Sequence, residues 1–390
     1  MTEWSLLFLL LPVAAASGWY LGRRGSERQR GQQVSKLSTT YFRGLNFLLN
    51  EQPDKAIEVF LEIAEVDKGT VETHFALGNL FRRRGEVDRA IRVHQNLIDR
   101  STLTEEQRTQ AVLELGEDFM RAGLLDRAEQ LFSEMVKVNA SVPQALKHLI
   151  SIYQQERDWP KAIEHARLFE TATGEPKGKL VAQFQCELAE LSRAQGDIPA
   201  ARGFLAAAYR DDSNCIRAGI LEGQIELAAG NEQAAIRAFE RVARHDVEYL
   251  PEFLKPLLGC YERRGERVRA RGFLAEMIER YPGVSALLAQ TRMIDQDEGR
   301  DAAVDFLTRQ LRQRPSVRGQ GALIELSLAH GSAEERDSLL VLKQLTEQLV
   351  AGTPAYRCGR CGFGARAHHW QCPSCKNWGT VKPIHGPTGE

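Results

Sequence analysis

The fold is decided by residues that recur along the chain, and the stretch GQIELAAGNEQAAIRAF at positions 223–239 shows them together. Gly230 precedes Ala235 by five residues, Gly223 precedes it by twelve, and Phe239 follows it by four. The same alanine slot is found at Ala56, Ala90, Ala128, Ala162, Ala201, Ala235 and Ala270, with spacings of 34, 38, 34, 39, 34 and 35 residues. Periods of this length are typical of arrays in which each repeat is one supersecondary unit.

The companions of this alanine recur in the same register. The glycine five residues earlier is found at Gly85, Gly123, Gly196, Gly230 and Gly265. The glycine twelve residues earlier is found at Gly44, Gly78, Gly116 and Gly223. The position four residues later holds Phe60, His94, Phe132, Ala166, Leu205, Phe239 and Leu274. Small residues let paired helices approach closely, and a large apolar residue fills the groove to the next repeat.

This pattern resembles the tetratricopeptide repeat, which implies a mainly α fold: an α-solenoid of helix pairs over residues 37–350. Seven repeats are readable from about 37 to 283, and two degenerate units at 299–311 and 316–350 bring the total to about nine. The extra residues predict longer loops near 101–105 and 173–178. Such arrays bind peptide or protein segments on a concave face, so partner binding is expected on the exposed concave face of 37–350.

The first residues predict a membrane anchor. From Trp4 to Gly22 there is no charged side chain, and nineteen residues of helix span roughly 28 Å, close to the thickness of a bilayer core. A cleaved signal peptide is the alternative, with Ala14–Ala16 as its cleavage site, but no positive charge precedes the apolar run. Ala14, Gly18 and Gly22 would lie on one helix face and could pack against another helix.

The segment after the span predicts its orientation. Residues 23–36 form a basic linker that holds Arg23, Arg24, Arg28, Arg30 and Lys36 against one acid, Glu27. The positive-inside rule therefore places the bulk of the chain on the cytoplasmic side of the membrane.

Two Cys-x-x-Cys pairs near the end predict a metal site. Cys358 and Cys361 form the first pair, Cys372 and Cys375 form the second, and ten residues separate the pairs. Each pair can grip one side of a tetrahedral ion, so the four thiolates are predicted to bind one zinc or iron ion. A disulfide pair or free thiols are the alternatives, and the doubled spacing favours metal.

The other metal-ligating residue types in the chain have simpler interpretations. Four cysteines complete a tetrahedral shell, so His368 and His369, between the pairs, are expected at the surface or behind the ligands. Cys186, Cys215 and Cys260 are expected to be buried and structural, as free cysteines usually are.

The C-terminal module, residues 354–390, resembles a rubredoxin-like ribbon through its Tyr-x-Cys-x-x-Cys-Gly-Phe opening and its Cys-Pro-x-Cys second pair. The whole order of anchor, linker, repeats and ribbon resembles the lipopolysaccharide assembly protein B family of Gram-negative inner-membrane proteins. The most specific part is the ending, with Tyr-Arg-Cys at 356–358, His-Trp at 369–370, Cys-Pro-Ser-Cys at 372–375 and Trp-Gly-Thr-Val-Lys-Pro-Ile at 378–384.

The family resemblance implies a function. It implies a single-pass inner-membrane adaptor that couples the membrane protease FtsH to LpxC, the deacetylase that commits carbon to lipid A, and so limits lipopolysaccharide synthesis. It also implies that the protein gathers other lipopolysaccharide-synthesis proteins at the membrane.

Composition and motifs agree with an adaptor and leave two alternatives. The sequence contains no phosphate-binding glycine loop, zinc-protease motif or nucleophile elbow, so no enzymatic activity is predicted. A redox-active rubredoxin-type electron-transfer protein is one alternative, because four thiolates also hold iron. A nucleic-acid-binding ribbon is the other, and a formal net charge of −1 argues against it.

Overall fold

The computed structural model describes residues 39–50, 52–66, 71–328 and 333–390. The predicted membrane span and the basic linker lie outside these residues. Within the described ranges, no helix is long and apolar enough to cross a membrane. The chain forms two compact units, one of residues up to 158 with 171–173 and the other of 159–170 with 174–390.

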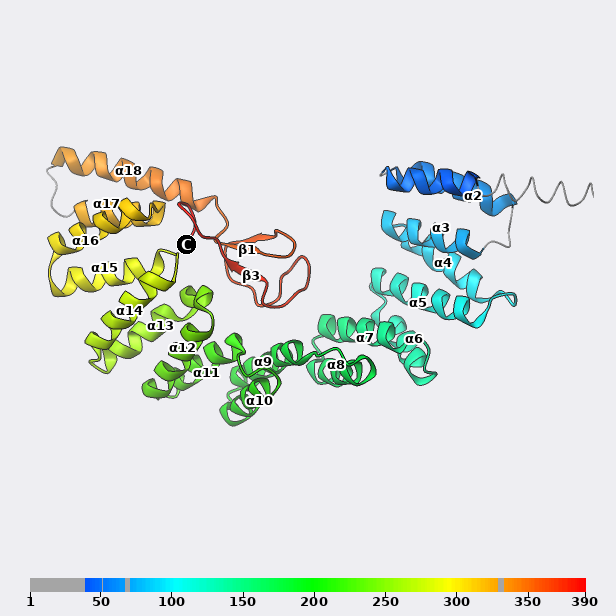
Figure 1. Ribbon diagram of the computed structural model, residues 1–390, viewed down its shortest axis with the longest axis horizontal. Coiled ribbons are helices and arrows are strands. Elements are labelled where there is room, and N and C mark those ends of the chain that lie inside the picture. Colours follow the sequence, from blue (N-terminus) through cyan, green and yellow to red (C-terminus); the bar gives the residue numbers. More distant parts are fainter. Residues whose placement is uncertain (1–38, 51, 67–70, 329–332) are drawn as a thin grey trace, which may run out of the picture. The chain divides into compact units, whose positions relative to one another are not determined.

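The described part of the first unit is helical, and short turns join its helices from α3 onward (Figure 1). Its helices are 39–49, α2 (Pro53–Val66), α3 (Val71–Arg84), α4 (Val87–Ile98), α5 (Glu105–Arg121), α6 (Leu125–Lys137) and α7 (Val142–Glu156). The helices pack in consecutive pairs, α3 with α4 and α5 with α6. The predicted longer loop near 101–105 is present between α4 and α5.

The second unit continues the same plan and ends in the ribbon. Its helices are α8 (Trp159–Thr173), α9 (Gly178–Ala194), α10 (Ile198–Asp211), α11 (Ile216–Ala228), α12 (Glu232–His245), η1 (Val247–Tyr249), α13 (Leu250–Arg263), α14 (Arg267–Arg280), α15 (Ser285–Asp297), α16 (Arg300–Gln313), α17 (Val317–Leu328) and α18 (Ala333–Ala351). The predicted loop near 173–178 separates α8 from α9. In Figure 1 the helices of this unit follow one another around the ribbon strands.

The recurring residues have the roles that the pattern predicts. Gly230 ends α11 with a φ of 74°, a left-handed conformation that glycine adopts without steric conflict. The glycines of the same slot also have positive φ: Gly85, Gly123, Gly196 and Gly265. Ala235 and Phe239 are fully buried, and a Cβ atom at Gly223 would lie only 2.4 Å from the Phe239 ring. The mainly helical, tetratricopeptide-type fold is therefore confirmed.

The predicted bounds of one degenerate repeat were too short. The degenerate unit at 299–311 covers only α16, whereas the structure places a complete first helix, α15, before it. The small-residue slot twelve positions before the buried Ala303 is Thr291 here, so α15 lacks the glycine that marks other first helices.

Gly223 allows a direct test of the packing. Alanine at this position is expected to lower the free energy of unfolding by about 1–3 kcal/mol, because its methyl group overpacks against Phe239. Gly272 of α14 is a matched control, since a Cβ atom there meets no other atom within 4 Å. Gly272→Ala should stabilise the protein by up to about 1 kcal/mol through helix propensity. Urea midpoints of the two variants check the prediction, and equal midpoints would contradict it.

The ribbon is a small antiparallel sheet of three strands in the order β2-β1-β3. The strands are β1 (Tyr356–Cys358), β2 (Gly364–Ala365) and β3 (Val381–Pro383). Tyr356 pairs with Ala365 on one side and with Pro383 on the other. The buried cluster of the ribbon centres on Cys358, Cys372 and Val381, and Ala365 and Pro383 are buried beside them, so the ribbon has only a small core of its own.

Candidate metal centre and its contact with the repeats

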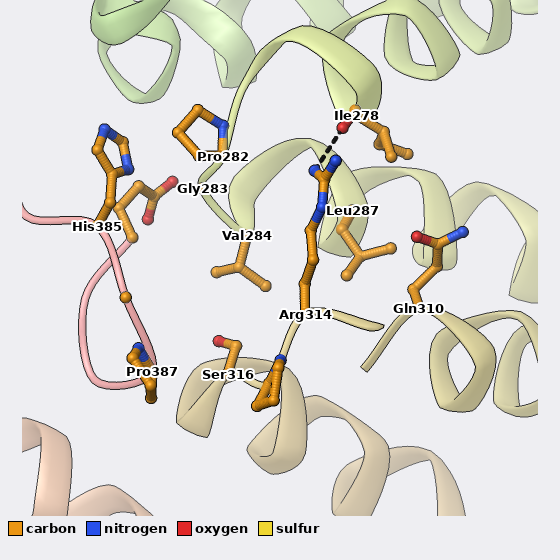
Figure 2. Close-up of a pocket in the computed structure, with 13 residues that line it drawn as sticks. Ile278, Pro282, Gly283, Val284, Leu287, Gln310, Arg314, Ser316, His385 and Pro387 are labelled. Carbon is orange, nitrogen blue, oxygen red and sulfur yellow. Dashed lines mark hydrogen bonds between the residues drawn. The ribbon is translucent and has the colours of Figure 1, made fainter. Parts of the chain in front are cut away.

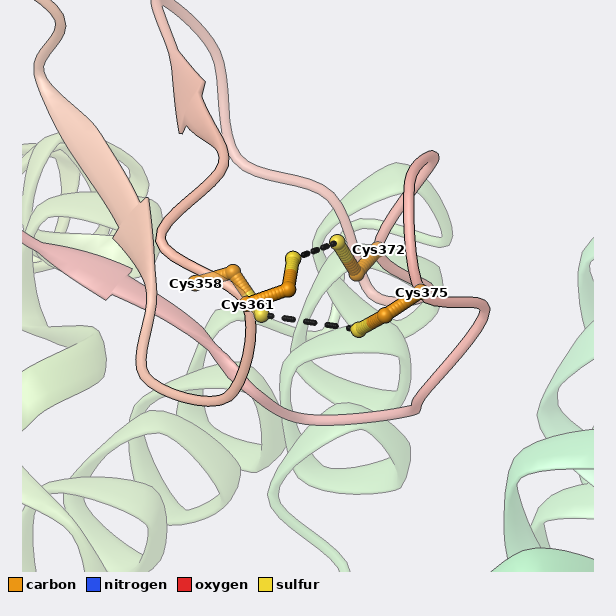
Figure 3. A group of neighbouring side chains, drawn as sticks. All are labelled: Cys358, Cys361, Cys372 and Cys375. Atoms are coloured by element: carbon orange, nitrogen blue, oxygen red, sulfur yellow. Dashed lines mark hydrogen bonds between the residues drawn. The ribbon is translucent and has the colours of Figure 1, made fainter. Parts of the chain in front are cut away.

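The four predicted ligands are brought to one point by the two Cys-x-x-Cys turns. Cys358 ends β1, Cys361 closes the first turn, and the second turn carries Cys372 and Cys375. Their sulfur atoms all lie within 4.8 Å of one another, and Figure 3 shows the four side chains converging.

The sulfur geometry fits a tetrahedral thiolate site. The Sγ atoms of Cys358 and Cys375 are 3.7 Å apart, and those of Cys361 and Cys372 are also 3.7 Å apart. A metal–sulfur distance of about 2.3 Å implies a tetrahedral edge of roughly 3.8 Å. The four cysteines can therefore hold one metal ion as thiolates, with no geometric preference between zinc and iron.

The protein environment already favours the thiolate at one ligand and opposes it at another. A hydrogen bond with the Thr380 hydroxyl, whose oxygen lies 3.3 Å from Sγ, is the main cause that lowers the pKa of Cys358 to about 6. Burial raises the pKa of Cys372 to about 11. A bound cation lowers the pKa of every thiol that coordinates it. Cys372 would therefore also be a thiolate when a metal ion is bound.

The backbone of each turn is closed by the residue after its second cysteine. Gly362 has a φ of 78° and donates its N–H to the Cys358 carbonyl, at 3.0 Å. Lys376 has a φ of 56° at the matching place and donates to the Cys372 carbonyl, at 2.9 Å. The second turn therefore keeps the usual backbone form although a lysine replaces the usual glycine.

A buried arginine joins the second turn to the repeats. Arg217 of α11 is 2% exposed, and its guanidinium lies 5.7 Å from the Trp370 ring centre and 5.5 Å from that of Trp378. Its Nη2 donates to Glu187 at 2.8 Å and to Glu190 at 2.5 Å. Burial alone would lower the pKa of Arg217, but the two carboxylates raise it above its usual range, so the guanidinium stays charged.

The two tryptophans that contact Arg217 flank the second Cys-x-x-Cys turn. Trp370 lies two residues before Cys372, and Trp378 lies three residues after Cys375. The Gly379 N–H donates to the Trp370 carbonyl at 2.8 Å, which ties the two sides together. The metal-binding turn therefore sets the spacing between the two rings that receive Arg217.

Aromatic contacts extend the interface on both sides. The Tyr249 ring stacks on Trp370 with centres 5.2 Å apart, and the Trp378 ring meets Phe184 edge-on at 6.1 Å. His368 meets Trp370 edge-on at 4.5 Å and Tyr249 edge-on at 5.5 Å, and burial lowers its pKa to about 4. His368 is thus a neutral interface residue, although the sequence suggested a position at the surface or behind the metal ligands.

Polar side chains of the ribbon meet acids at the amino-terminal ends of the helices. Three contacts share this plan: Lys382 Nζ to Asp246 at 2.6 Å, the Tyr356 hydroxyl to Glu252 at 2.6 Å, and His385 Nε2 to Glu248 at 2.6 Å. Burial raises the pKa of Glu252, and the Tyr356 hydroxyl opposes part of that rise. These contacts hold the ribbon in one orientation on η1 and α13.

The chain after β3 continues along the repeats. Pro387 accepts a hydrogen bond from the Val317 N–H at 2.7 Å, and the Glu390 carboxylate contacts Ser285 and lies 2.7 Å from Arg318. The ribbon therefore contacts the first helices of successive pairs, from α9 to α17. The docked ribbon covers these helix ends, so a partner cannot reach them. Less of the concave face expected over residues 37–350 is therefore available for binding a partner.

The three other cysteines lie away from the metal centre. Cys186, Cys215 and Cys260 are buried, as the sequence predicted. The Sγ atoms of Cys186 and Cys215 lie 3.9 Å apart. Sequence reasoning did not single out Arg217, because a lone arginine on a helix normally marks a solvated face.

Models of known families match both parts of the chain. The rubredoxin metal binding domain matches residues 356–383, within the ribbon. Tetratricopeptide repeat models match residues 73–109 and 113–176.

Relatives named lipopolysaccharide assembly protein B match nearly the whole chain. Lipopolysaccharide assembly protein B of Escherichia coli K12 is 41% identical over 388 residues, which cover 98% of this chain and 99% of the relative. Lipopolysaccharide assembly protein B of Haemophilus influenzae Rd is 34% identical over 390 residues, covering 97% and 98%. Among solved structures, pilF of Pseudomonas aeruginosa is similar with a TM-score of 0.33 at 14% identity, covering 53% of this chain and 90% of that one.

Proposed function

Because the chain belongs to the lipopolysaccharide assembly protein B family, we propose that it is a non-enzymatic adaptor in lipopolysaccharide assembly. It would act at the Gram-negative inner membrane as a single-pass protein, with its body on the cytoplasmic side. Residues 1–22 would anchor it, 23–36 would form the basic linker, 37–350 the repeats and 354–390 the metal-binding ribbon.

In the finer form of this proposal, the adaptor brings the deacetylase LpxC to the membrane protease FtsH. Degradation of LpxC then limits the first committed step toward lipid A. Tethering the adaptor beside the protease raises the effective concentration of the delivered substrate. The same arrangement would gather other lipopolysaccharide-synthesis proteins at the membrane.

One observation supports the adaptor proposal beyond the family relationship: the ribbon packs against the repeats of the second unit, and we propose that the two act as one recognition body. Arg217, between Trp370 and Trp378, is buried for this contact, and cationic or aromatic groups lining a substrate pocket would instead stay accessible. A metal ion in the ribbon would thus stabilise the ribbon surface that packs on the repeats, which is the role of a structural metal site.

The first unit supplies an ordered polar surface of its own. Arg82 on α3 lies 2.6 Å from Glu114, 2.9 Å from Glu117 and 2.9 Å from the buried Asp118, all on α5. His148 on α7 lies 3.4 Å from Glu117. These groups join three successive first helices, and the partly exposed ones, chiefly Glu117 and His148, form a candidate surface for a protein partner.

The half-life of LpxC tests the proposed function. We expect LpxC to persist several-fold longer in cells that lack this protein, because delivery to FtsH is lost. Removal of residues 354–390 should prolong it as well, since the ribbon is part of the recognition body. Pulse-chase measurement of LpxC in the three strains gives the answer, with a stable cytoplasmic protein as the loading control. An unchanged half-life in both altered strains would overturn the adaptor proposal.

A further inference from the structure

A groove lies where the end of the ribbon crosses the last repeats. It consists of two adjoining cavities of about 410 and 380 Å³, which share Pro315, Ser316 and Pro387. Figure 2 shows the first cavity between the ribbon tail, with His385 and Pro387, and the helices that carry Val284, Leu287 and Gln310. Its size is in the range of sites for small organic ligands.

The floor of the groove is apolar. The first cavity is lined by Ile278, Val284 and Leu287, and the second by Leu311, Val317 and Leu323. These side chains come from α14, from α15 and the turn before it, from α16 and from α17, so the groove follows the stacking of the array. An apolar ligand chain buried here would gain hydrophobic free energy in proportion to its covered area.

The rim of the groove is cationic. Arg312 and Arg314 line it, both are exposed, and neither has an ion-pair partner among the described residues. Arg314 uses Nη1 to donate to the Ile278 carbonyl at 2.7 Å, which fixes the guanidinium over the first cavity and leaves its other donors free.

The acidic group at the groove is already neutralised. Glu390 is 6% exposed, and its carboxylate is held by Arg318 at 2.7 Å and by Ser285. His385 uses Nε2 for Glu248, whereas its buried Nδ1 has no hydrogen-bond partner among the described residues. The cations of the groove that lack an ion-pair partner among the described residues are therefore Arg312 and Arg314.

We propose that this groove binds a small amphipathic anion: a single apolar chain that ends in a carboxylate or a phosphate. The chain lies on the apolar floor, and the anionic end pairs with Arg314 and Arg312. The wall contributed by Pro387 and His385 makes the site composite, so it exists only while the ribbon is docked.

Photolabelling of the full-length protein in a neutral maltoside detergent tests this site. The probe is a dodecanoic acid that carries a diazirine on its chain, and mass spectrometry maps the labelled peptides. We expect labelling within residues 278–323 and 385–390. Unlabelled laurate and dodecyl phosphate should both compete, and their relative potency distinguishes a carboxylate from a phosphate ligand. Dodecanol should compete at least about ten-fold more weakly, because it lacks the charge.

Three variants sharpen the test. Arg312→Gln with Arg314→Gln should weaken competition by laurate about ten-fold, and Gln310→Trp should block labelling by filling the first cavity. Arg309→Gln is the matched control, since Arg309 is exposed on α16 but does not line the groove. Equal competition by dodecanol, labelling elsewhere in the chain, or competition by an acidic peptide alone would overturn the proposal. None of these outcomes depends on the half-life of LpxC.

Discussion

Replacement of Cys372 by serine is expected to remove the metal ion and release the ribbon from the repeats. The ribbon has a small buried core, centred on Cys358, Cys372 and Val381, so its folding depends on the ion. Structural zinc sites contribute about 10–16 kcal/mol of apparent binding free energy, which exceeds what such a core can supply. Without the ion the spacing of Trp370 and Trp378 is lost, and Arg217 loses both aromatic faces.

Three measurements check this prediction. Elemental analysis should fall from one zinc or iron ion per chain to nearly none, trypsin should cleave rapidly at Arg357 and Arg366, and tryptophan emission should shift to longer wavelength. The half-life of LpxC should approach that in cells lacking the protein. Cys260→Ser is the control, since Cys260 is buried in α13 and lies outside the metal centre. Unchanged metal content in Cys372→Ser would contradict the ligand assignment.

Local sequence predicted the repeats because each of their determinants acts within one helix pair. Gly230 ends a helix, and Ala235 and Phe239 fill the space behind it, all within one repeat. The convergence of the four cysteines was predictable for the same reason, since each Cys-x-x-Cys turn is a local structure. The spacing of the two pairs needed no knowledge of the remaining fold.

The docking of the ribbon depends on residues far apart in the chain, which no local pattern connects. Arg217 meets Trp370 and Trp378 across more than 150 residues of sequence. In the sequence, Arg217 looks like any solvated helix arginine, and the two tryptophans look like the core of a small module. The incomplete α15 prediction has a similar cause, because Thr291 is buried through tertiary packing in a slot where other repeats carry glycine.

Replacement of Arg217 by alanine should undock the ribbon while leaving its metal in place. The guanidinium is buried against two indole rings and held by Glu187 and Glu190. A desolvated cation–π contact is worth about 2 kcal/mol, and breaking a buried ion pair costs about 3–5 kcal/mol. The ion pairs lie within the repeats, since Glu187 and Glu190 are on α9, and only the cation–π contact reaches the ribbon. We therefore expect a loss of about 2 kcal/mol of docking free energy.

Such a loss shifts the docking equilibrium by roughly 30-fold toward the free ribbon, at 1.4 kcal/mol per factor of ten. Metal content should stay at one ion per chain, because none of the four cysteines has changed. Proteolysis between the repeats and the ribbon should accelerate, and the half-life of LpxC should lengthen toward the value without the protein. Arg217→Lys should be intermediate, since lysine keeps the charge but lacks the planar group that stacks between the rings.

The Arg217→Ala and Cys372→Ser variants together separate the roles of the metal and the docked surface. If the ion only holds the ribbon in shape, the Arg217→Ala protein, which is metal-loaded but undocked, should lose its effect on LpxC to the same extent as Cys372→Ser. The half-life of LpxC should then be equally long with either variant. Arg237→Ala on the exposed face of α12 is the control for removal of an arginine, and it should behave like the unchanged protein. Normal LpxC turnover in an Arg217→Ala protein whose ribbon is shown to be undocked would mean that the repeats recognise their partner alone. In that case the contact between Arg217 and the two tryptophans would serve only the stability of the ribbon.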